Sequence, residues 1–149
     1  MQPEPRLFLD TSALFAGIWS AQGGARMLLK LGEAGVAELL VSSQVLGEIE
    51  EAIRRKAMQL LPALAVLLDR SNVISVPAAP QRLFERCREL VAHPGDARIL
   101  ADAWQAQVDY LVTLDKAHFL DAPALAEGVT FPIGTPGDCL AWIREKLKG

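Results

Sequence analysis

The chain of 149 residues is long enough for one domain with a substantial core, and it leaves little room for a second. We therefore expect a single domain over residues 1–149. Hydrophobic residues make up 51% of the chain and charged residues 22%, a composition that excludes an intrinsically disordered protein. The formal net charge of −3 excludes nucleic-acid binding by bulk positive charge, although an enzyme could still meet nucleic acid at a local basic patch.

Neither a membrane anchor nor a cysteine framework is indicated. No apolar run reaches the roughly 18 residues that a membrane span needs, and the N-terminus lacks a basic region followed by a signal-type apolar stretch. The two cysteines, Cys87 and Cys139, form no metal-type spacing and suggest no disulfide framework. We expect a soluble cytoplasmic protein.

Short apolar runs alternate with helical spacings in the first half of the chain. Residues 6–10 and 37–42 predict buried strands. Between them, residues 23–35 predict a helix that ends at Gly35. Residues 43–58 predict a second helix, with a serine as its N-cap and apolar residues recurring on one face.

The second half continues the alternation. A helix at about residues 60–68 leads to a β-branched strand at residues 72–76. Two further helices are predicted over residues 80–93 and 93–107, each with a proline near its start. The apolar run at residues 109–115 is a fourth strand, again followed by a carboxylate.

The C-terminal part completes the pattern. Residues 129–136 predict a fifth strand, and residues 136–147 predict a terminal helix capped by Thr135. Strands separated by helices imply parallel pairing, so we expect an α/β fold, a three-layer sandwich with a central, mainly parallel sheet of four to five strands.

Four carboxylates occur at the starts and ends of these elements. Asp10 and Asp115 each end an apolar strand, Glu48 lies in the first turns of one helix, and Asp96 lies at the start of another. Sites in parallel sheets form outside the carboxyl ends of the strands. We therefore expect Asp10 to leave its charge unburied at this edge and to point at Asp96 and Asp115.

Converging carboxylates repel one another unless a cation neutralises them. Mg²⁺ or Mn²⁺ suits such an oxygen-rich site, and a metal of this kind polarises a phosphoryl oxygen and generates hydroxide for phosphodiester hydrolysis. Each acid alone has an ordinary structural explanation, such as a turn, a helix cap, a solvated face or a favourable helix dipole. Four such coincidences on one predicted edge favour a shared site.

Basic residues near these acids are candidate contacts for a phosphate backbone. The clearest run is Arg54, Arg55 and Lys56, which extends from the helix that carries Glu48. A charge run on a helix is more often only a solvated face. A nuclease in an acidic protein nonetheless needs local positive charge to hold its substrate.

Other polar and aromatic residues receive structural interpretations. Asp102 lies six residues beyond Asp96, away from the same helix face, and is interpreted as a surface or interface residue. His118 follows Asp115 by three residues, and this nearness to a candidate site residue makes it a candidate substrate contact. The three tryptophans are expected in the core or at an interface rather than as base-stacking platforms.

Four segments together resemble the signature blocks of the PIN-domain family. They are "LFLDTSAL", "LVSSQVLGEIEEAI", "HPGDARILADAWQAQVDYLVTLDKAHF" and "TPGDCLAWI", in this order. The resemblance runs from Leu7 to about Ile143 and is greatest to single-domain toxin components of toxin–antitoxin systems, the VapC-like ribonucleases. It implies metal ligands at Asp10, Glu48, Asp96 and Asp115, which would also be the catalytic residues, with Ser12 and Thr113 supporting them through hydrogen bonds.

The same resemblance implies RNA as the substrate, Mg²⁺ or Mn²⁺ as the cofactor, and an antitoxin protein as a possible partner. A homodimer is also expected, from the three tryptophans and the high apolar fraction. Many relatives have Asp-Thr-Asn where this chain has Asp10-Thr11-Ser12, a mild departure because serine can still donate to a carboxylate.

Two alternatives to a nuclease follow from the same residues. The chain could be a PIN-like binding module with weak or lost catalysis that acts through a protein partner. A strand-terminal aspartate could also accept a phosphoryl group, but aspartate-nucleophile phosphatases usually need a second aspartate two residues on, where this chain has Ser12.

Overall fold

A five-stranded sheet forms the centre of the computed structural model, which describes residues 3–115, 118–119 and 128–148. The strand order is β3-β2-β1-β4-β5, and every neighbouring pair is parallel. The strands are β1 (Arg6–Leu9), β2 (Glu38–Ser42), β3 (Ile74–Val76), β4 (Tyr110–Val112) and β5 (Ile133–Gly134). The predicted α/β fold with a parallel sheet is confirmed.

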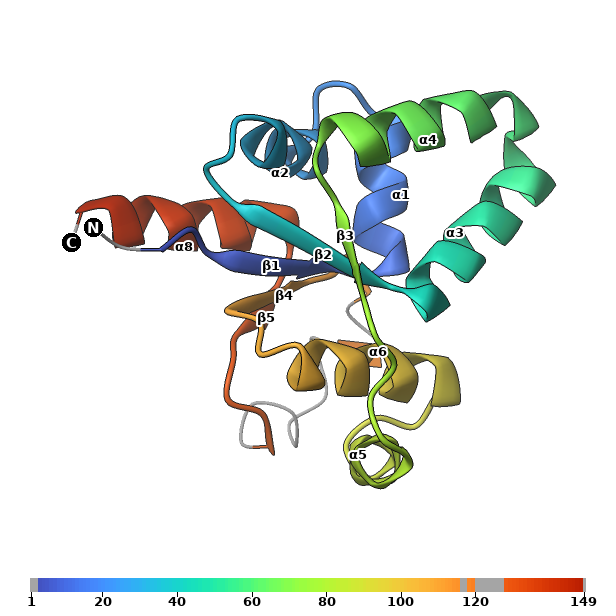
Figure 1. The fold of residues 1–149 in the computed structure, drawn as a ribbon, viewed down its shortest axis with the longest axis vertical. Coiled ribbons are helices and arrows are strands. Elements are labelled where there is room, and N and C mark those ends of the chain that lie inside the picture. The colour runs from blue at the N-terminus through green and yellow to red at the C-terminus, as the bar shows by residue number, and fades with distance from the viewer. Residues whose placement is uncertain (1–2, 116–117, 120–127, 149) are drawn as a thin grey trace.

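Helices cover both faces of this sheet. They are α1 (Thr11–Trp19), α2 (Gly24–Glu33), α3 (Ser43–Lys56), a 3₁₀ turn (Met58–Leu60), α4 (Leu61–Arg70), α5 (Gln81–Arg88), α6 (Pro94–Gln105) and α8 (Pro136–Lys148). Helices α1, α2 and α4 lie on one face and α5 and α6 on the other, while α8 packs against α2 (Figure 1). None of the helices in the described part of the chain is long and apolar enough to cross a membrane.

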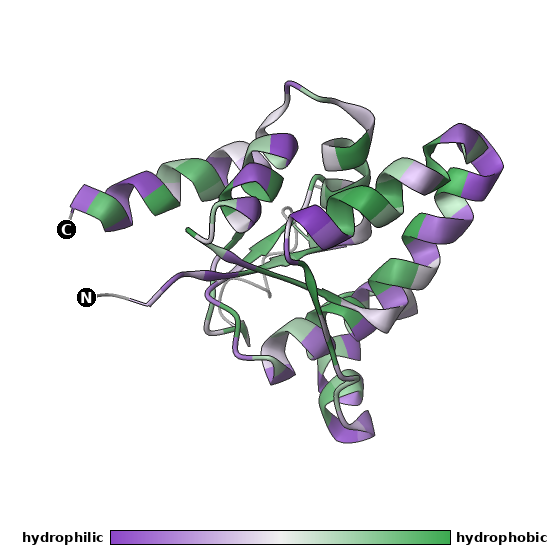
Figure 2. Cartoon of the chain, turned by 45° about the horizontal axis from the view of Figure 1, so that its top comes forward, coloured by the Kyte–Doolittle hydropathy of each residue, from purple (hydrophilic) through white to green (hydrophobic). Residues whose placement is uncertain are grey.

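The central strands are buried on both faces. Leu7, Phe8, Leu39, Leu40 and Leu111 have no exposed surface. A strand covered on both sides reads as a continuous apolar run rather than as an alternation, which is the pattern seen in the sequence. Figure 2 shows the same division, with apolar strands inside and polar residues along the outer sides of the helices.

Helix α1 has no counterpart among the predicted elements. Its residues are apolar over most of the helix circumference, and Ala13, Leu14, Gly17 and Ile18 are buried. A helix packed between the sheet and other helices lacks the contrast between an apolar and a polar face on which a prediction from periodicity depends. The helix therefore became evident only from the packing around it.

Two strands end earlier than predicted. Strand β1 ends at Leu9, and Asp10 is the N-cap residue of α1. Strand β4 ends at Val112, so that Asp115 lies in the segment beyond the strand rather than at its last position. Both acids nevertheless follow strands that are neighbours in the sheet, because β1 pairs directly with β4.

Gly32 is a close-packing point between α2 and β2, and it gives a test of the fold. A Cβ atom there would lie 2.5 Å from Leu39 Cδ1 and 2.6 Å from the backbone oxygen of Ser71. We expect Gly32→Ala to lower the free energy of unfolding by about 1–3 kcal/mol in urea denaturation, because the backbone oxygen cannot move aside freely.

The matched control is Gly47→Ala in α3, where an added Cβ would meet nothing within 4 Å. This change should raise the free energy of unfolding by about 0.5–1 kcal/mol through helix propensity alone. Equal effects of the two substitutions would contradict the packing described for Gly32.

Candidate active site

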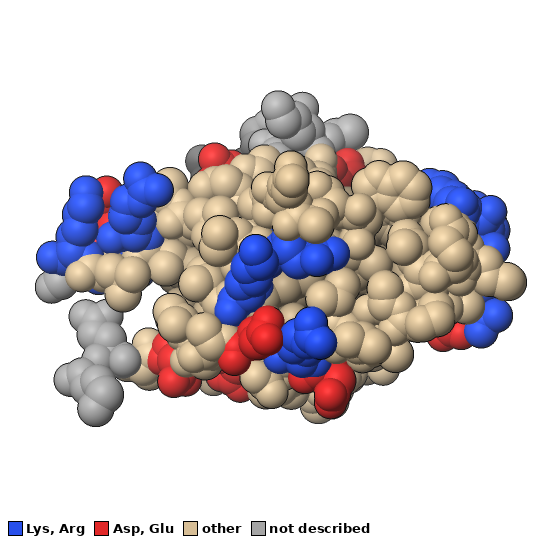
Figure 3. Space-filling view, turned by 90° about the horizontal axis from the view of Figure 1, so that it is seen from above, with Lys and Arg blue, Asp and Glu red and all other residues tan. Residues whose placement is uncertain are grey.

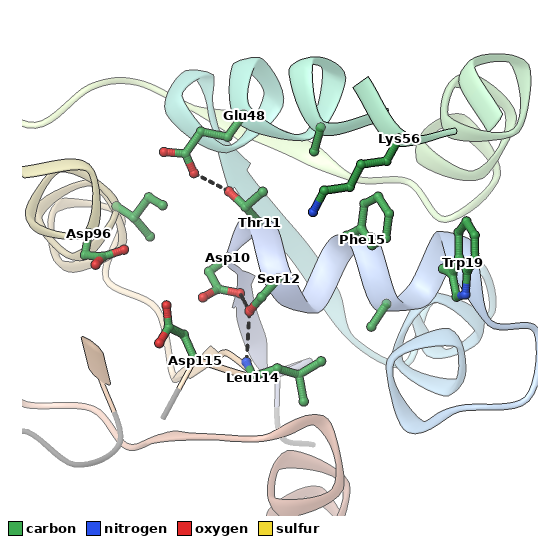
Figure 4. Close-up of a pocket in the computed structure, with 13 residues that line it drawn as sticks. Asp10, Thr11, Ser12, Phe15, Trp19, Glu48, Lys56, Asp96, Leu114 and Asp115 are labelled. Atoms are coloured by element: carbon green, nitrogen blue, oxygen red, sulfur yellow. Dashed lines mark hydrogen bonds between the residues drawn. The ribbon is translucent and has the colours of Figure 1, made fainter. Parts of the chain in front are cut away.

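All four predicted acids line one cavity. It has a volume of about 530 Å³ and lies at the carboxyl edge of the sheet, where α1, α3 and α6 begin. Asp10, Glu48, Asp96 and Asp115 all contribute to its wall. Figure 4 shows Asp10, Asp96 and Asp115 facing a common space from three different segments. Glu48 lies beyond Thr11 as seen from Asp10.

Asp10 is held by donors from two parts of the chain. Its Oδ1 accepts from Ser12 Oγ at 2.7 Å and from the backbone N–H of Ala13 at 2.9 Å, and its Oδ2 accepts from Thr113 Oγ1. The carboxylate is only 3% exposed. The expectation that its charge stays unburied is therefore wrong, because the side chain turns inward to cap α1 as well as lining the cavity.

Burial raises the pKa of the Asp10 carboxyl above its ordinary value. The hydrogen bonds from Thr113, Ala13 and Ser12 oppose this rise because they stabilise the charged form, whereas the charge of Asp115 adds to it. Asp10 and Asp115 thus repel each other at the site, as the sequence analysis anticipated for carboxylates brought to one edge.

Ser12 and Thr113 connect Asp10 to the segment that carries Asp115. Ser12 Oγ accepts from the backbone N–H of Leu114 at 2.9 Å, and Thr113 Oγ1 accepts from the backbone N–H of Asp115 at 3.0 Å. Each hydroxyl therefore donates to Asp10 and accepts from the chain just after β4. This double use fixes the position of Asp115 relative to Asp10.

Glu48 is oriented by its own pair of donors. Its Oε1 accepts from Thr11 Oγ1 at 2.5 Å, and its Oε2 accepts from Gln44 Nε2 at 2.6 Å. Thr11 is the first residue of α1 and Gln44 is one turn before Glu48 on α3, so the carboxylate is tied to both helices.

Among the described residues, Asp96, Asp115 and His118 form a group of potential metal ligands. One ligand atom from each lies within 4.8 Å of the others. His118 Nδ1 is 2.6 Å from Asp96 Oδ2 and 2.9 Å from Asp115 Oδ2, and its ring stacks on that of His93 with the centroids 5.7 Å apart. The imidazole therefore contacts the acids themselves, a position that the sequence spacing suggested only as a substrate contact.

A backbone hydrogen bond ties His118 to Asp115. The backbone N–H of His118 donates to Asp115 Oδ1 at 3.1 Å. Asp115 therefore accepts a hydrogen bond from this backbone and lines the cavity at the same time.

The buried oxygen of Asp96 is its Oδ2. It lies 2.6 Å from the Nδ1 of His118 and, among the described residues, accepts no other hydrogen bond. Burial raises the pKa of Asp96. The charges of His118 and His93 lower this pKa, whereas the charges of Asp115 and Glu48 raise it. An oxygen in this state is a suitable ligand for a hard cation such as Mg²⁺ or Mn²⁺.

The residues present therefore fit a divalent cation. The site offers carboxylate oxygens, which Mg²⁺ and Mn²⁺ prefer, and their mutual repulsion is what a cation would relieve. The described group of Asp96, Asp115 and His118 marks where the ligand atoms already converge. Asp10 and Glu48 line the same cavity with oxygens that are oriented by internal donors.

The predicted basic run contributes one residue to the cavity wall. Lys56 lines the cavity, whereas Arg54 and Arg55 do not, and Arg54 pairs with Glu50 at 3.0 Å on the solvent side of α3. On the face seen in Figure 3, Lys and Arg side chains form separate groups with uncharged surface between them.

Asp102 is not the surface or interface residue that the sequence suggested. It is 2% exposed, and it accepts from the backbone N–H of Ala79 at 2.8 Å while lying 3.4 Å from Arg98 Nε. Burial raises its pKa, and Ala79 and Arg98 oppose the rise. It has a structural role in joining α6 to the segment before α5, away from the cavity.

The burial of Asp10 predicts a pH-dependent gain in stability for Asp10→Asn. Because the folded pKa is raised, the wild type loses stability as the pH rises from below 3.8 through the folded pKa. The neutral variant lacks this loss. In chelator-containing buffer, raising the pH from 3 to 7 should shift the difference in free energy of unfolding between variant and wild type in favour of the variant, by about 1.4 kcal/mol for each unit of raised pKa.

Urea denaturation of both proteins between pH 3 and pH 8 measures this difference. The gap should be smallest at the acid end and widen with rising pH. A gap that is constant with pH would mean that the donors around Asp10 offset its burial completely.

Comparison with known proteins gives a family and a fold. A family model described as PIN domain matches residues 6–117 of the chain. No curated protein is similar enough in sequence to give a match.

Solved structures share the fold at low sequence identity. VapBC from Salmonella typhimurium, a DNA-bound complex, has 17% identity and a TM-score of 0.66, over 89% of this chain and 98% of that one. VapBC2 from Rickettsia felis, bound to a promoter DNA fragment, has 19% identity and a TM-score of 0.62, over 87% and 98%. VapC20 from Mycobacterium tuberculosis, a toxin that cleaves the sarcin-ricin loop, has 18% identity and a TM-score of 0.54, over 83% and 96%.

Proposed function

The chain belongs to the PIN-domain family, and from this premise we propose that it is a divalent-metal-dependent endoribonuclease. The observation that carries the proposal is the cavity at the carboxyl edge of the sheet, whose wall includes Asp10, Glu48, Asp96 and Asp115. Four carboxylates around one open cavity are costly without a cation and useful with one.

Each group has a defined part in this proposal. Asp10, Glu48, Asp96 and Asp115 would hold Mg²⁺ or Mn²⁺ and orient the attacking water, and Ser12 and Thr113 hold the carboxylate of Asp10 in place. A bound divalent cation polarises the phosphoryl oxygen and lowers the pKa of water. Lys56, and less directly Arg54 and Arg55, supply positive charge for the RNA backbone.

We further propose that the protein is the toxin of a toxin–antitoxin pair that acts on RNA in the cytoplasm. Support comes from the VapBC complexes and the VapC20 toxin, which share its fold. An antitoxin protein would then be its partner, and a homodimer its expected state. The competing function is a PIN-like binding module without catalysis. The presence of all four acids on the cavity wall favours the enzyme.

RNA cleavage by the purified protein is the direct test. With Mg²⁺ or Mn²⁺ we expect cleavage of single-stranded RNA, which a chelator abolishes. Asp96→Asn and Asp115→Asn should each lower the rate by at least about 10²-fold, the scale on which electrostatic groups at an active site act. Asp69→Asn, an exposed carboxylate on α4 outside the cavity wall, is the matched control and should cleave at the wild-type rate.

Binding of the cation is tested separately from cleavage. At a Mn²⁺ concentration 100 times its dissociation constant, the free energy of unfolding should rise by about 2.7 kcal/mol, seen as a higher melting temperature in a thermal denaturation scan. Asp96→Asn should lose most of this rise, and Asp69→Asn should keep it. A protein that binds Mn²⁺ in this way but cleaves no RNA would be the non-catalytic module instead.

A further inference from the structure

The cavity has an apolar arm beside its acidic centre. Phe15 and Trp19 line it from α1, and Leu114 lines it from the segment after β4. Trp19 is 61% exposed. The other two tryptophans differ, since Trp104 packs edge-on against Phe131 and Trp142 packs against Tyr110. Packing in the interior therefore accounts for Trp104 and Trp142 but not for the exposed Trp19.

Phe15 and Trp19 form a ladder along α1. Their ring centroids are 5.9 Å apart and their planes differ by 14°. The spacing of four residues places both rings on one side of the helix, about 6 Å apart along its axis. Phe15 thereby supports one face of the indole, so that Trp19 presents a rigid aromatic surface beside the cavity.

The ladder begins close to the acids. Asp10 is the N-cap of the same helix, so Phe15 lies about 7.5 Å and Trp19 about 13.5 Å along the axis from it. A strand whose phosphate reaches the acids and which then follows α1 would bring a base to the exposed ring of Trp19.

Lys56 lies between the two parts of the cavity. Figure 4 shows its side chain reaching from α3 towards α1, with the acids on one side and the aromatic pair on the other. Within the described part of the chain it makes no salt bridge, unlike Arg54. An unpaired cation between an acidic centre and an aromatic ladder fits a nucleic-acid phosphate better than an apolar peptide.

We propose that Trp19, backed by Phe15, is a stacking subsite for a nucleobase of single-stranded RNA a short distance along the strand from the scissile bond, with Lys56 on an intervening phosphate. The inference rests on the proposed ribonuclease function and names how the substrate is held. Aromatic stacking accepts any base, so this subsite contributes affinity and direction of the strand rather than a sequence code. It requires an unpaired base, which makes single-stranded RNA or a loop the substrate.

Binding to a fluorescein-labelled, twelve-nucleotide single-stranded RNA, measured by anisotropy, tests the subsite. The proteins carry Asp10→Asn so that the probe stays intact. Adding Trp19→Ala should weaken binding roughly 5- to 140-fold, the loss of one stacked base converted to affinity. Trp19→Phe should restore most of it. Met27→Ala, which removes another exposed apolar side chain from outside the cavity wall, should leave binding unchanged.

Probes with a single abasic nucleotide separate stacking from a structural effect. At one position the missing base should weaken binding to the Asp10→Asn protein by the same factor as Trp19→Ala, and it should have no further effect on the Trp19→Ala protein. Lys56→Gln should reduce the slope of log affinity against log salt concentration by the amount expected for about one phosphate contact, and Arg55→Gln should reduce this slope less. Equal salt slopes for these two variants would overturn the assignment of Lys56.

Two results would overturn the stacking subsite. One is unchanged RNA affinity of the Trp19→Ala protein; the other is the absence of any abasic position at which the two losses overlap. If light scattering then shows that Trp19→Ala dissociates an oligomer at unchanged RNA affinity, the ladder is a protein contact. Failure of the proposed function is distinct, because it would appear as no cleavage by the wild-type protein with Mg²⁺ or Mn²⁺.

Discussion

The buried carboxylate of Asp10 is the constraint on which the site depends. It sits where β1 passes into α1, and its backbone N–H donates to Val112 at 3.1 Å, which continues the pairing with β4. An ionised group with so little exposed surface needs donors, and Ser12, Ala13 and Thr113 provide them. The hydroxyls of Ser12 and Thr113 also accept hydrogen bonds from the backbone after β4, so the groups that hold Asp10 position Asp115 as well.

This arrangement explains why a charged cavity is compatible with an apolar sheet. The strands end before the acids, and the polar atoms are gathered in the layer where the strands end and the helices begin. Helix N-termini stabilise negative charge, and both Asp10 and Asp96 lie at the start of a helix. Local hydrogen bonds and dipoles offset part of the cost of burying these carboxylates, and burial still raises the pKa of Asp10 and of Asp96.

The cavity wall also combines acidic and aromatic side chains from segments that are far apart in the sequence. Acids from four separate segments form one end, the Phe15–Trp19 ladder forms the other, and Lys56 lies between them. Helix α1 connects the two ends because Asp10 caps its N-terminus and Trp19 is its last residue. A helix without an apolar periodicity in its sequence is therefore the element that aligns the two parts of the cavity. Which of its side chains face the core and which face the cavity depends on the elements packed around it.

The sequence by itself determined the alternation of strands and helices, the parallel sheet and the shared edge for the four acids. These are consequences of local apolar runs and of the direction in which parallel strands must end. Only the tertiary structure decided that Asp10 is buried, that His118 joins Asp96 and Asp115, that Asp102 lies in the interior, and that Lys56 rather than Arg54 faces the cavity. Each of these outcomes depends on contacts between segments far apart in the chain, and no local pattern encodes which side chain a distant segment will meet.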